Sequence, residues 1–352
     1  MSRIALIPGE GIGPEITAEV VKVLGAVQSR SGLDLHLATL DHRTGAGKPA
    51  GQASLEKLIE ELPNNFDAIF IGSLGEANGA ETAWGAELRR VIIAKMDLFA
   101  HFRPVKFLDE RRCPLKNKRA EEIQFAVISD NGAGILPEFG GSYRKGTPQE
   151  IFLRQMISTW QGADRIVRYA FDYVRLQGLK RLALSCHYSA PAGEDDLLKR
   201  VFDERRAEHP GVETSEMPIP TLMAQLLRTP EQFEVILTNG LYSDAIGNLG
   251  AELQGGINLG ASADLHPGRA SLFMAADGGR HNARQDHANP LGAMLAMALM
   301  LEHLGLDQEA QWVEGAVKNA LGTDNTTYDL GGRLNTHQVG DFLAQQIKRA
   351  AC

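Results

Sequence analysis

The segment that decides the fold is RIALIPGEGIGPEI, residues 3–16, near the start of the chain. Residues 3–8 (RIALIP) form a short apolar run that is typical of a buried strand. The glycines that follow predict a tight turn. Pro14 and Glu15 suit the first turn of a helix, since proline fits there and glutamate lies at the positive end of the helix dipole. With the helical pattern at 16–27, the segment predicts a strand–turn–helix unit.

Strand patterns and helical patterns alternate along the rest of the chain. Strands or extended segments are expected at 68–72, 98–105, 125–129, 181–185 and 235–239. Helices are expected at 55–62, 86–96, 151–177, 194–209, 290–304, 308–321 and 336–350. Three stretches look irregular: a charged connection at 107–122, a glycine-rich arm at 131–149 and a glycine-rich loop at 254–263. The alternation predicts an α/β fold whose parallel or mixed sheet is covered by helices on both faces.

The composition is that of a folded protein with a sizeable core. The chain has 352 residues, which suggests two domains, and 43% of them are hydrophobic while 23% are charged. Its net charge of -8 argues against nucleic acid and anionic membranes as partners, because both require a basic face. A small anionic ligand is compatible with this charge, since it needs only a local cationic cluster.

The sequence carries no visible signal for export or membrane insertion. Residues 1–13 (MSRIALIPGEGIG) have no apolar region after a basic start, so we expect no signal peptide. The apolar stretch at 290–306 is soon interrupted by charge and too short to span a bilayer, which indicates a core helix. Cys113, Cys186 and Cys352 are odd in number and far apart, as thiols in a reducing compartment are. We therefore expect a cytoplasmic protein.

Six segments carry a resemblance to one enzyme family. They are IALIPGEGIGPEI at 4–16, MDLFAHFRPVK at 96–106, PEQFEVILTNGLYSDAIGNLGAEL at 230–253, GGINLGASA at 255–263, HANPLGAMLAMALML at 287–301 and TYDLGGRLNTHQVGDFL at 327–343. Together and in this order they resemble the β-decarboxylating dehydrogenases of the isocitrate/isopropylmalate dehydrogenase family. The pattern is most similar to that of the 3-isopropylmalate dehydrogenases, and it covers essentially the whole chain.

The resemblance implies a two-domain α/β fold in which the domains share a mixed central sheet with helices on both faces. A large domain on the nucleotide side would comprise residues 1–104 and 254–352, and a small domain would comprise 105–253. An arm at about 131–160 would pair with the same arm of a second subunit. The family architecture therefore implies a homodimer whose active site lies in the cleft between the domains.

The implied fold is not a Rossmann fold, although Gly9, Gly11 and Gly13 invite that interpretation. Their spacing is GxGxG, whereas the dinucleotide fingerprint is GxGxxG. A tight turn before a helix is the better explanation for these glycines.

The resemblance implies a small anionic substrate held by arginines. A malate-like substrate has two or more carboxylates, which fixed guanidinium groups neutralise. Arg103 matches one substrate arginine, with a surface salt bridge as the alternative interpretation. The preceding family arginine falls on Ile93, so Arg89 or Arg90 could replace it only if their helix shifts, and the third falls on Ser129. The expected cluster of three cations is thus reduced to as few as one.

The metal site that the resemblance implies is also incomplete. Asp244 matches one family aspartate, and the next, four residues along the helix, is Asn248. An i, i+4 pair shares a helix face, so both could reach one Mg²⁺ or Mn²⁺ ion, although one carboxylate and one amide make a weak site. The aspartate that a partner subunit would supply falls near 220–221, where no carboxylate stands. Asp244 could instead be a charge at the first turn of the helix.

Three residues are candidates for proton transfer. The family lysine falls on His187, whose imidazole can move protons near neutral pH, although a structural role is the alternative. The family tyrosine falls near Ser158, and serine has too high a pKa to act as a general acid without help. Tyr143, in the arm, is a possible replacement.

The residues that would line NAD or NADP are Gly260, Ser262, Gly278 and Asn289. The loop at 274–283 (MAADGGRHNA) departs from the family pattern, because a methionine and an aspartate stand where the family has glutamate and histidine. The resemblance does not distinguish NAD from NADP.

Three functions fit the sequence. The first is an NAD(P)-dependent oxidoreductase that acts on a small malate-like 2-hydroxy acid, with most standard catalytic residues replaced. The second is an enzyme of a specialised pathway that uses the same fold for different chemistry. The third is a catalytically silent ligand-binding or regulatory subunit. Because loss of a single catalytic group commonly lowers rates on the order of 10²–10⁴-fold, we expect poor activity on isopropylmalate and isocitrate.

Overall fold

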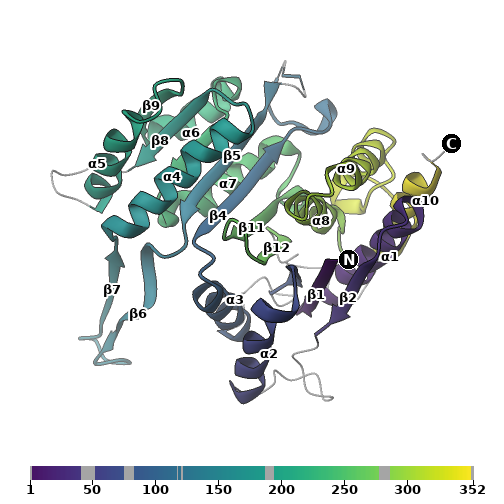
Figure 1. Cartoon of the computed structure of the whole chain (residues 1–352), viewed down its shortest axis with the longest axis horizontal. Coiled ribbons are helices and arrows are strands. Elements are labelled where there is room, and N and C mark those ends of the chain that lie inside the picture. The colour runs from purple at the N-terminus through teal and green to yellow at the C-terminus, as the bar shows by residue number, and fades with distance from the viewer. Residues whose placement is uncertain are drawn as a thin grey trace. The chain divides into compact units, whose positions relative to one another are not determined.

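The chain forms two compact units in the computed structural model (Figure 1). Unit 1 comprises Met1–Leu98, Lys106–Ala120 and Ala251–Cys352, and unit 2 comprises Phe99–Val105 and Glu121–Gly250. The residues that the structure describes are 2–40, 52–74, 83–116, 118–119, 122–186, 194–276 and 286–349.

Unit 1 contains five strands in the order β2-β1-β3-β12-β11. Their bounds are β1 (Ser2–Gly9), β2 (Leu35–Thr39), β3 (Ala68–Ser73), β11 (Ala261–Leu265) and β12 (Ser271–Ala275). β1 pairs in parallel with β2 and β3, β3 pairs in parallel with β12, and β12 pairs antiparallel with β11. The strands of unit 1 therefore form a mixed arrangement, as the resemblance implied.

Helices cover these strands on both faces. They are α1 (Gly13–Ser31), α2 (Gln52–Asn65), α3 (Ala83–Met96), α8 (Leu291–His303), α9 (Asp307–Gly322) and α10 (Thr336–Arg349). α1 packs on β1 and β3 and α8 on β11 and β12, while α10 packs on α1 and α9 on α8. Nearly every residue of α8 is buried, which confirms the core helix expected at 290–304.

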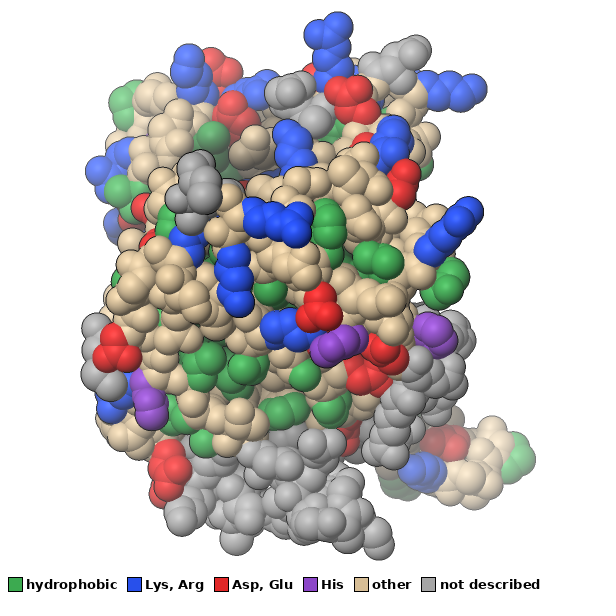
Figure 2. Space-filling model, turned by 90° about the vertical axis from the view of Figure 1, so that its right-hand side faces the viewer, with side chains coloured by type: hydrophobic (Ala, Val, Ile, Leu, Met, Phe, Trp, Pro, Cys, Tyr) green, Lys and Arg blue, Asp and Glu red, His purple; other side chains and the backbone are tan. Residues whose placement is uncertain are grey.

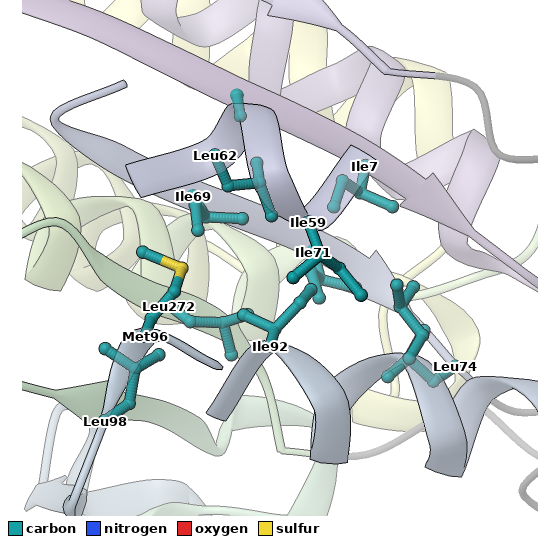
Figure 3. Packing of buried hydrophobic residues seen from close by; sticks show 12 residues of the cluster. Ile7, Ile59, Leu62, Ile69, Ile71, Leu74, Ile92, Met96, Leu98 and Leu272 are labelled. Carbon is teal, nitrogen blue, oxygen red and sulfur yellow. The ribbon is translucent and has the colours of Figure 1, made fainter. Parts of the chain in front are cut away.

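The apolar cluster of unit 1 joins α2 and α3 to the sheet (Figure 3). Leu62 of α2 and Ile92 of α3 meet Ile69 and Ile71 of β3, and all four side chains are fully buried. The run AIFIGS at 68–73 is apolar without alternation because both faces of a central parallel strand are covered.

The glycine turn between β1 and α1 depends on the absence of side chains. Gly9 has a φ of 78°, and a Cβ there would lie 1.8 Å from the backbone oxygen of Ser73. A Cβ on Gly13, where α1 begins, would lie 2.1 Å from the backbone oxygen of Pro8. The interpretation as a tight turn before a helix is confirmed.

Five of the strands of unit 2 lie side by side in the order β4-β5-β10-β8-β9. Their bounds are β4 (Ala100–Lys106), β5 (Gln124–Asp130), β8 (Arg181–Cys186), β9 (Glu213–Pro218) and β10 (Val235–Thr238). β10 pairs in parallel with β5 and β8, and β8 pairs in parallel with β9. The helices are α4 (Trp160–Leu176), α5 (Glu194–Arg206), α6 (Ile219–Arg228) and α7 (Gly240–Gln254).

Helices α4 and α7 cover opposite faces of these strands. Phe102 of β4 packs on Tyr173 of α4, with ring centroids 5.1 Å apart, whereas the next residue, Arg103, contacts α7. Successive residues of a strand point to opposite faces, so α4 and α7 lie on the two sides.

A two-stranded hairpin corrects one sequence prediction. β6 (Gly134–Tyr143) and β7 (Ile151–Ile157) pair antiparallel, so the helix expected to begin at residue 151 is wrong over 151–157. The run IFLRQMI is rich in apolar residues, and periodicity alone does not distinguish a short apolar strand from a helical turn. The helix begins only at Trp160, after Thr159, whose side chain accepts a hydrogen bond from the backbone N–H of Gly162 at 3.1 Å.

Two surface properties bear on possible partners. No helix among the described residues is both long and apolar enough to cross a membrane. On the face drawn in Figure 2, lysine and arginine side chains are interspersed with acidic and hydrophobic ones and do not form one uniformly basic patch. The described residues of that face therefore offer no extended cationic surface to a polyanion.

Candidate functional site

Arg103 is the candidate residue with the best-defined surroundings. Its side chain is only 5% exposed, and its guanidinium lies against α7. Nη2 donates to Oδ1 of Asn248 at 2.7 Å. Nη1 lies 3.4 Å from Oδ1 of Asp244 and 3.3 Å from the backbone oxygen of the same residue. Arg103 is thus a buried cation, and the alternative of a surface salt bridge does not describe it.

Two glycines of α7 permit this close approach. A Cβ on Gly247 would lie 2.6–2.7 Å from Nε, Cδ and Cζ of Arg103. A Cβ on Gly250, three residues along the same helix face, would lie 2.4 Å from Cγ2 of Val105. Since real atoms do not come so close, the two glycines allow β4 to lie directly against the backbone of α7.

His101 is a candidate residue that the sequence prediction missed. It is buried, and its Nε2 lies 3.8 Å from Oδ1 of Asp244. The signal was present in FAHFRP, because positions 101 and 103 are two apart on one strand and therefore share a face with Arg103. Asp244 consequently has an imidazole and a guanidinium as neighbours.

The two predicted metal ligands do share a face of α7, but a guanidinium occupies the space beside them. Asp244 and Asn248 both direct a side-chain oxygen at Arg103. Within the described ranges there is no group of three or more His, Cys, Asp or Glu side chains with the geometry to hold a metal ion. The residues present therefore do not fit the divalent ion that the resemblance implied.

Ser129 lies at the carboxyl end of β5, in a row of buried hydroxyl groups. It is in register with Thr238 of β10, which is in register with Ser185 of β8. All three residues are buried, and the hydroxyl of Ser185 donates to the backbone oxygen of Met217 at 3.1 Å. Neutral hydroxyls thus stand where the resemblance predicted a substrate cation.

The candidates for proton transfer do not form a cluster in the part of the chain that is described. Tyr143 pairs with Ile151 at one end of the hairpin and is 63% exposed. Ser158 is half-buried and follows the other end of the hairpin, just before α4. His187 lies outside the described residues, so its role stays a prediction.

Two arginines in the middle of α3 have partners within unit 1. Arg90 binds Glu87 on the same helix at 2.7 Å. Arg89 makes two bonds to the buried carboxylate of Asp264 on β11, at 2.9 and 3.0 Å. This bidentate pair fixes α3 to β11, while the substrate role predicted for Arg90 stays untested.

The predicted cofactor residues that the structure describes also have structural contacts in unit 1. A Cβ on Gly260 would lie 2.8 Å from Cβ of Ala276, and the hydroxyl of Ser262 donates to the backbone oxygen of Met274 at 3.4 Å. Oδ1 of Asn289 accepts the backbone N–H of Leu291 at 2.9 Å, at the start of α8. Gly278 lies outside the described residues.

Asp329 is a second residue that the sequence prediction missed on this side. Its Oδ2 accepts hydrogen bonds from Asn289 at 2.9 Å and from Asn258 at 2.7 Å, and Thr327 donates to its Oδ1. The aspartate thus ties together three of the segments that carried the resemblance. It holds the side chain of Asn289 in one orientation next to the first turn of α8.

The mixed strand order, the glycine turn before α1 and the buried arginine against α7 describe an α/β protein of two units. The chain belongs to the isocitrate/isopropylmalate dehydrogenase family, whose family model matches residues 3–343. This confirms the resemblance and the fold class. The family is one of β-decarboxylating dehydrogenases, which are oxidoreductases.

Known proteins similar to this chain match it from end to end. It is 33% identical over 353 residues to a 3-isopropylmalate dehydrogenase of Thermobifida fusca (strain YX), with 98% of this chain and 97% of that protein covered. It is 30% identical over 351 residues to a probable tartrate dehydrogenase/decarboxylase of Agrobacterium vitis, with 98% and 97% covered. The crystal structure of isocitrate dehydrogenase from Methylococcus capsulatus matches with a TM-score of 0.83 at 26% identity, covering 99% of this chain and 100% of that one.

Proposed function

We propose that this chain is a divergent NAD- or NADP-dependent oxidoreductase that acts on a small malate-like 2-hydroxy acid. The observation that carries the proposal is the buried guanidinium of Arg103, in a chain that matches the family along its length. A buried cation requires paired anionic or polar partners, and a planar guanidinium matches a carboxylate in shape and charge.

Arg103 is proposed to bind one carboxylate of the substrate. Its bond to Asn248 is short, at 2.7 Å, whereas its contact with Oδ1 of Asp244 is long, at 3.4 Å, and therefore weak. The side chain of Asp244 is 75% exposed, so it can move into solvent and let a substrate carboxylate replace it on Nη1. Asn248 would meanwhile hold Nη2 in place, which fixes the orientation of the substrate.

The proposed substrate is small and carries few carboxylates. Ser129 offers a hydroxyl where a second guanidinium would be needed, and hydroxyls neutralise no charge. Multiply charged or bulky acids would therefore be bound poorly. This supports our expectation of low activity on isocitrate and isopropylmalate.

Oxidation of a 2-hydroxy acid requires a hydride acceptor and a base for the hydroxyl proton. NAD or NADP would accept the hydride, with Gly260, Ser262, Gly278 and Asn289 as its proposed binding residues. We propose His187 as the base, because neutral imidazole accepts a proton near pH 7. Tyr143 and Ser158 stay weaker proposals, since the hairpin separates them.

We also propose that the protein is a cytoplasmic homodimer with domains at 1–104 plus 254–352 and at 105–253. The hairpin β6–β7 supports the dimer, because it exposes the apolar side chains of Ile151, Phe152 and Leu153. An exposed cluster of this kind commonly marks a protein–protein contact.

The experiment that tests the function compares ligand-induced thermal stabilisation with turnover. We expect NAD⁺ or NADP⁺ to raise the Tm, because a ligand that binds only the folded state stabilises it in proportion to ln(1 + [L]/Kd). Nicotinamide reduction is then followed with malate, tartrate, isopropylmalate and isocitrate. Arg103→Met is expected to abolish turnover of the preferred acid. Arg175→Met, which breaks the exposed ion pair with Asp172 on α4, serves as the matched control and leaves turnover within about twofold, since exposed ion pairs contribute little.

The outcome also separates the alternatives. A nucleotide-dependent Tm shift retained in Arg103→Met shows that the variant is folded, so its loss of turnover is specific. Equal turnover of the wild type and Arg103→Met contradicts the substrate role of the arginine. Absence of a Tm shift with either nucleotide favours the catalytically silent subunit. A shift without turnover of any 2-hydroxy acid favours different chemistry.

A further inference from the structure

We propose that Arg103 takes the place of a divalent cation between Asp244 and Asn248, so that this chain holds its anionic ligand without Mg²⁺ or Mn²⁺. This inference concerns the binding of ions and rests on the proposed function only for the nature of the ligand. It follows from the contacts, the packing and the charges around one helix face of unit 2.

The contacts place a guanidinium beside both oxygens that would ligate a cation. The oxygen of Asn248 that would ligate a metal already accepts a hydrogen bond from Nη2 of Arg103 at 2.7 Å, and Oδ1 of Asp244 lies 3.4 Å from Nη1. An Mg²⁺ ion would need both oxygens at about 2.1 Å. Such an ion would stand within a few ångströms of the guanidinium, and two cations at that distance repel each other.

Packing fixes the guanidinium in this position. The absent side chain of Gly247 lets Nε, Cδ and Cζ of Arg103 lie where a Cβ would otherwise be, at 2.6–2.7 Å. The side chain is therefore held by the shape of α7 as well as by its hydrogen bonds. Moving it aside to admit an ion would expose a cavity against the helix backbone and leave Asn248 without its donor.

The charges near the site also disfavour a divalent ion. Asp244 supplies one negative charge and Asn248 none, while Arg103 contributes a positive charge. Helix α6 (IPTLMAQLLR), which includes positions 220–221, contains no carboxylate that a second subunit could offer. Hard divalent ions require several oxygen ligands with compensating negative charge, and this set is already neutral.

As a consequence, a guanidinium rather than a divalent ion polarises the bound ligand. A guanidinium donates directional N–H bonds and carries a single charge, whereas a divalent ion can chelate a carboxylate together with a neighbouring oxygen. A site of this kind favours recognition of one carboxylate through paired hydrogen bonds. Binding of such an acid is therefore expected to be unaffected by chelators.

Mn²⁺ binding to the complete chain tests the proposal directly, by the loss of the free Mn²⁺ signal in electron paramagnetic resonance. We expect no saturable binding to the wild type. The double variant Arg103→Met/Asn248→Asp removes the guanidinium and adds a carboxylate, so it is expected to raise Mn²⁺ affinity by roughly tenfold or more. Asn248→Asp alone is the matched control, and it should gain little because Arg103 is still present.

A second variant guards against misfolding of the first. Gly247→Ala keeps every charge but pushes the guanidinium off the helix, and it is expected to bind Mn²⁺ more tightly than the wild type. Circular dichroism establishes that each variant is folded.

Saturable Mn²⁺ binding by the wild type that is lost in Asp244→Asn overturns the proposal. So does a folded double variant that gains no affinity over Asn248→Asp, because the arginine would then not be what excludes the ion. Neither result depends on whether the protein oxidises a 2-hydroxy acid.

Discussion

The apolar cluster of unit 1 and the hairpin of unit 2 are built from similar side chains and differ in what covers them. Ile69 and Ile71 of β3 are fully buried beneath α2 and α3. Ile151 and Phe152 of β7 are 59% and 62% exposed, although their sequence is as apolar. A two-stranded hairpin has no second layer of its own, so these apolar residues stay exposed.

Apolar content alone therefore does not define the core of this protein. In the cluster, strands and helices of one unit pack against each other, and burial of their apolar side chains stabilises the fold. In the hairpin, the same kind of residues is exposed, so these side chains contribute little to the stability of the subunit. Substitutions in the cluster and in the hairpin distinguish these two roles.

The largest effect is expected from a cavity in the cluster. Leu62→Ala removes a fully buried side chain beneath β3, and such changes cost about 2–5 kcal/mol because the space is only partly refilled. Leu153→Ala on the hairpin is the matched control and should cost no more than about 0.5 kcal/mol in the isolated subunit. Urea unfolding of both variants checks the comparison, and equal losses would contradict it.

The second prediction concerns the hairpin and rests on the proposed homodimer. Replacing the exposed Phe152 with serine removes an aromatic contact of the kind that dominates interfaces, so the dimer Kd is expected to rise roughly tenfold or more. Sedimentation velocity across a range of concentrations measures this. The free energy of unfolding extrapolated to low concentration should hardly change. A wild-type protein that is monomeric at all concentrations would refute the proposed dimer.

Whether a strand could be predicted from the sequence depends on how far apart in the chain the residues that stabilise it lie. The buried strand at 68–73 was predictable, because an uninterrupted apolar run with turn signals on both sides has few other solutions. The strand at 151–157 was not, because its partner β6 and its exposure depend on the tertiary arrangement.

The candidate site likewise combines features that local spacing predicts with features that depend on contacts distant in the sequence. The shared face of Asp244 and Asn248 followed from their spacing of four residues on a helix. Their common partner Arg103 is 141 and 145 residues away in the sequence, so no local pattern could reveal that its guanidinium lies between them. His101 could have been found, since it is two residues from Arg103 on one strand, whereas Asp329 depends on contacts with two distant asparagines.

A third prediction concerns a titratable group at the edge of unit 1. His303, at the end of α8, is half-buried against Phe273, with ring centroids 5.3 Å apart, and its Nε2 lies 3.1 Å from the backbone oxygen of Arg269. Burial lowers the pKa of His303, although the hydrogen bond to Arg269 partly opposes this. The unfolded chain therefore binds the proton more readily than the folded one.

The sign of the pH dependence follows from this difference. The contribution of His303 to stability is complete above the unfolded imidazole pKa of about 6.5 and is lost as the pH falls through the lower folded value. One such group changes the free energy of unfolding by at most about 1.4 kcal/mol per pH unit. His303→Leu should flatten the stability profile between neutral pH and mildly acidic pH, as measured by urea unfolding. An unchanged slope would show that the imidazole does not titrate differently in the two states.

The smallest effect is expected at the surface contact between α1 and α10. Lys22 lies 2.8 Å from Oδ1 of Asp341 and also binds Glu19. The hydrogen bond from Lys22 lowers the pKa of Asp341. Burial acts to lower the pKa of Lys22, but its bonds to Asp341 and Glu19 outweigh this and raise it. The stabilisation is thus lost as the pH falls through the depressed pKa of Asp341, and again as it rises through the elevated pKa of Lys22.

Asp341→Asn measures how much this ion pair contributes at neutral pH. Because Asp341 is about half exposed and water screens the pair, we expect a loss of about 0.2–1 kcal/mol that shrinks further in high salt. The wild type and the variant should converge in stability below the pKa of the carboxyl, since protonation removes the same charge that the substitution removes. A loss comparable to that of Leu62→Ala would mean that α10 depends on charge rather than on its buried apolar face, and the contrast between buried and exposed contacts would then fail within unit 1 itself.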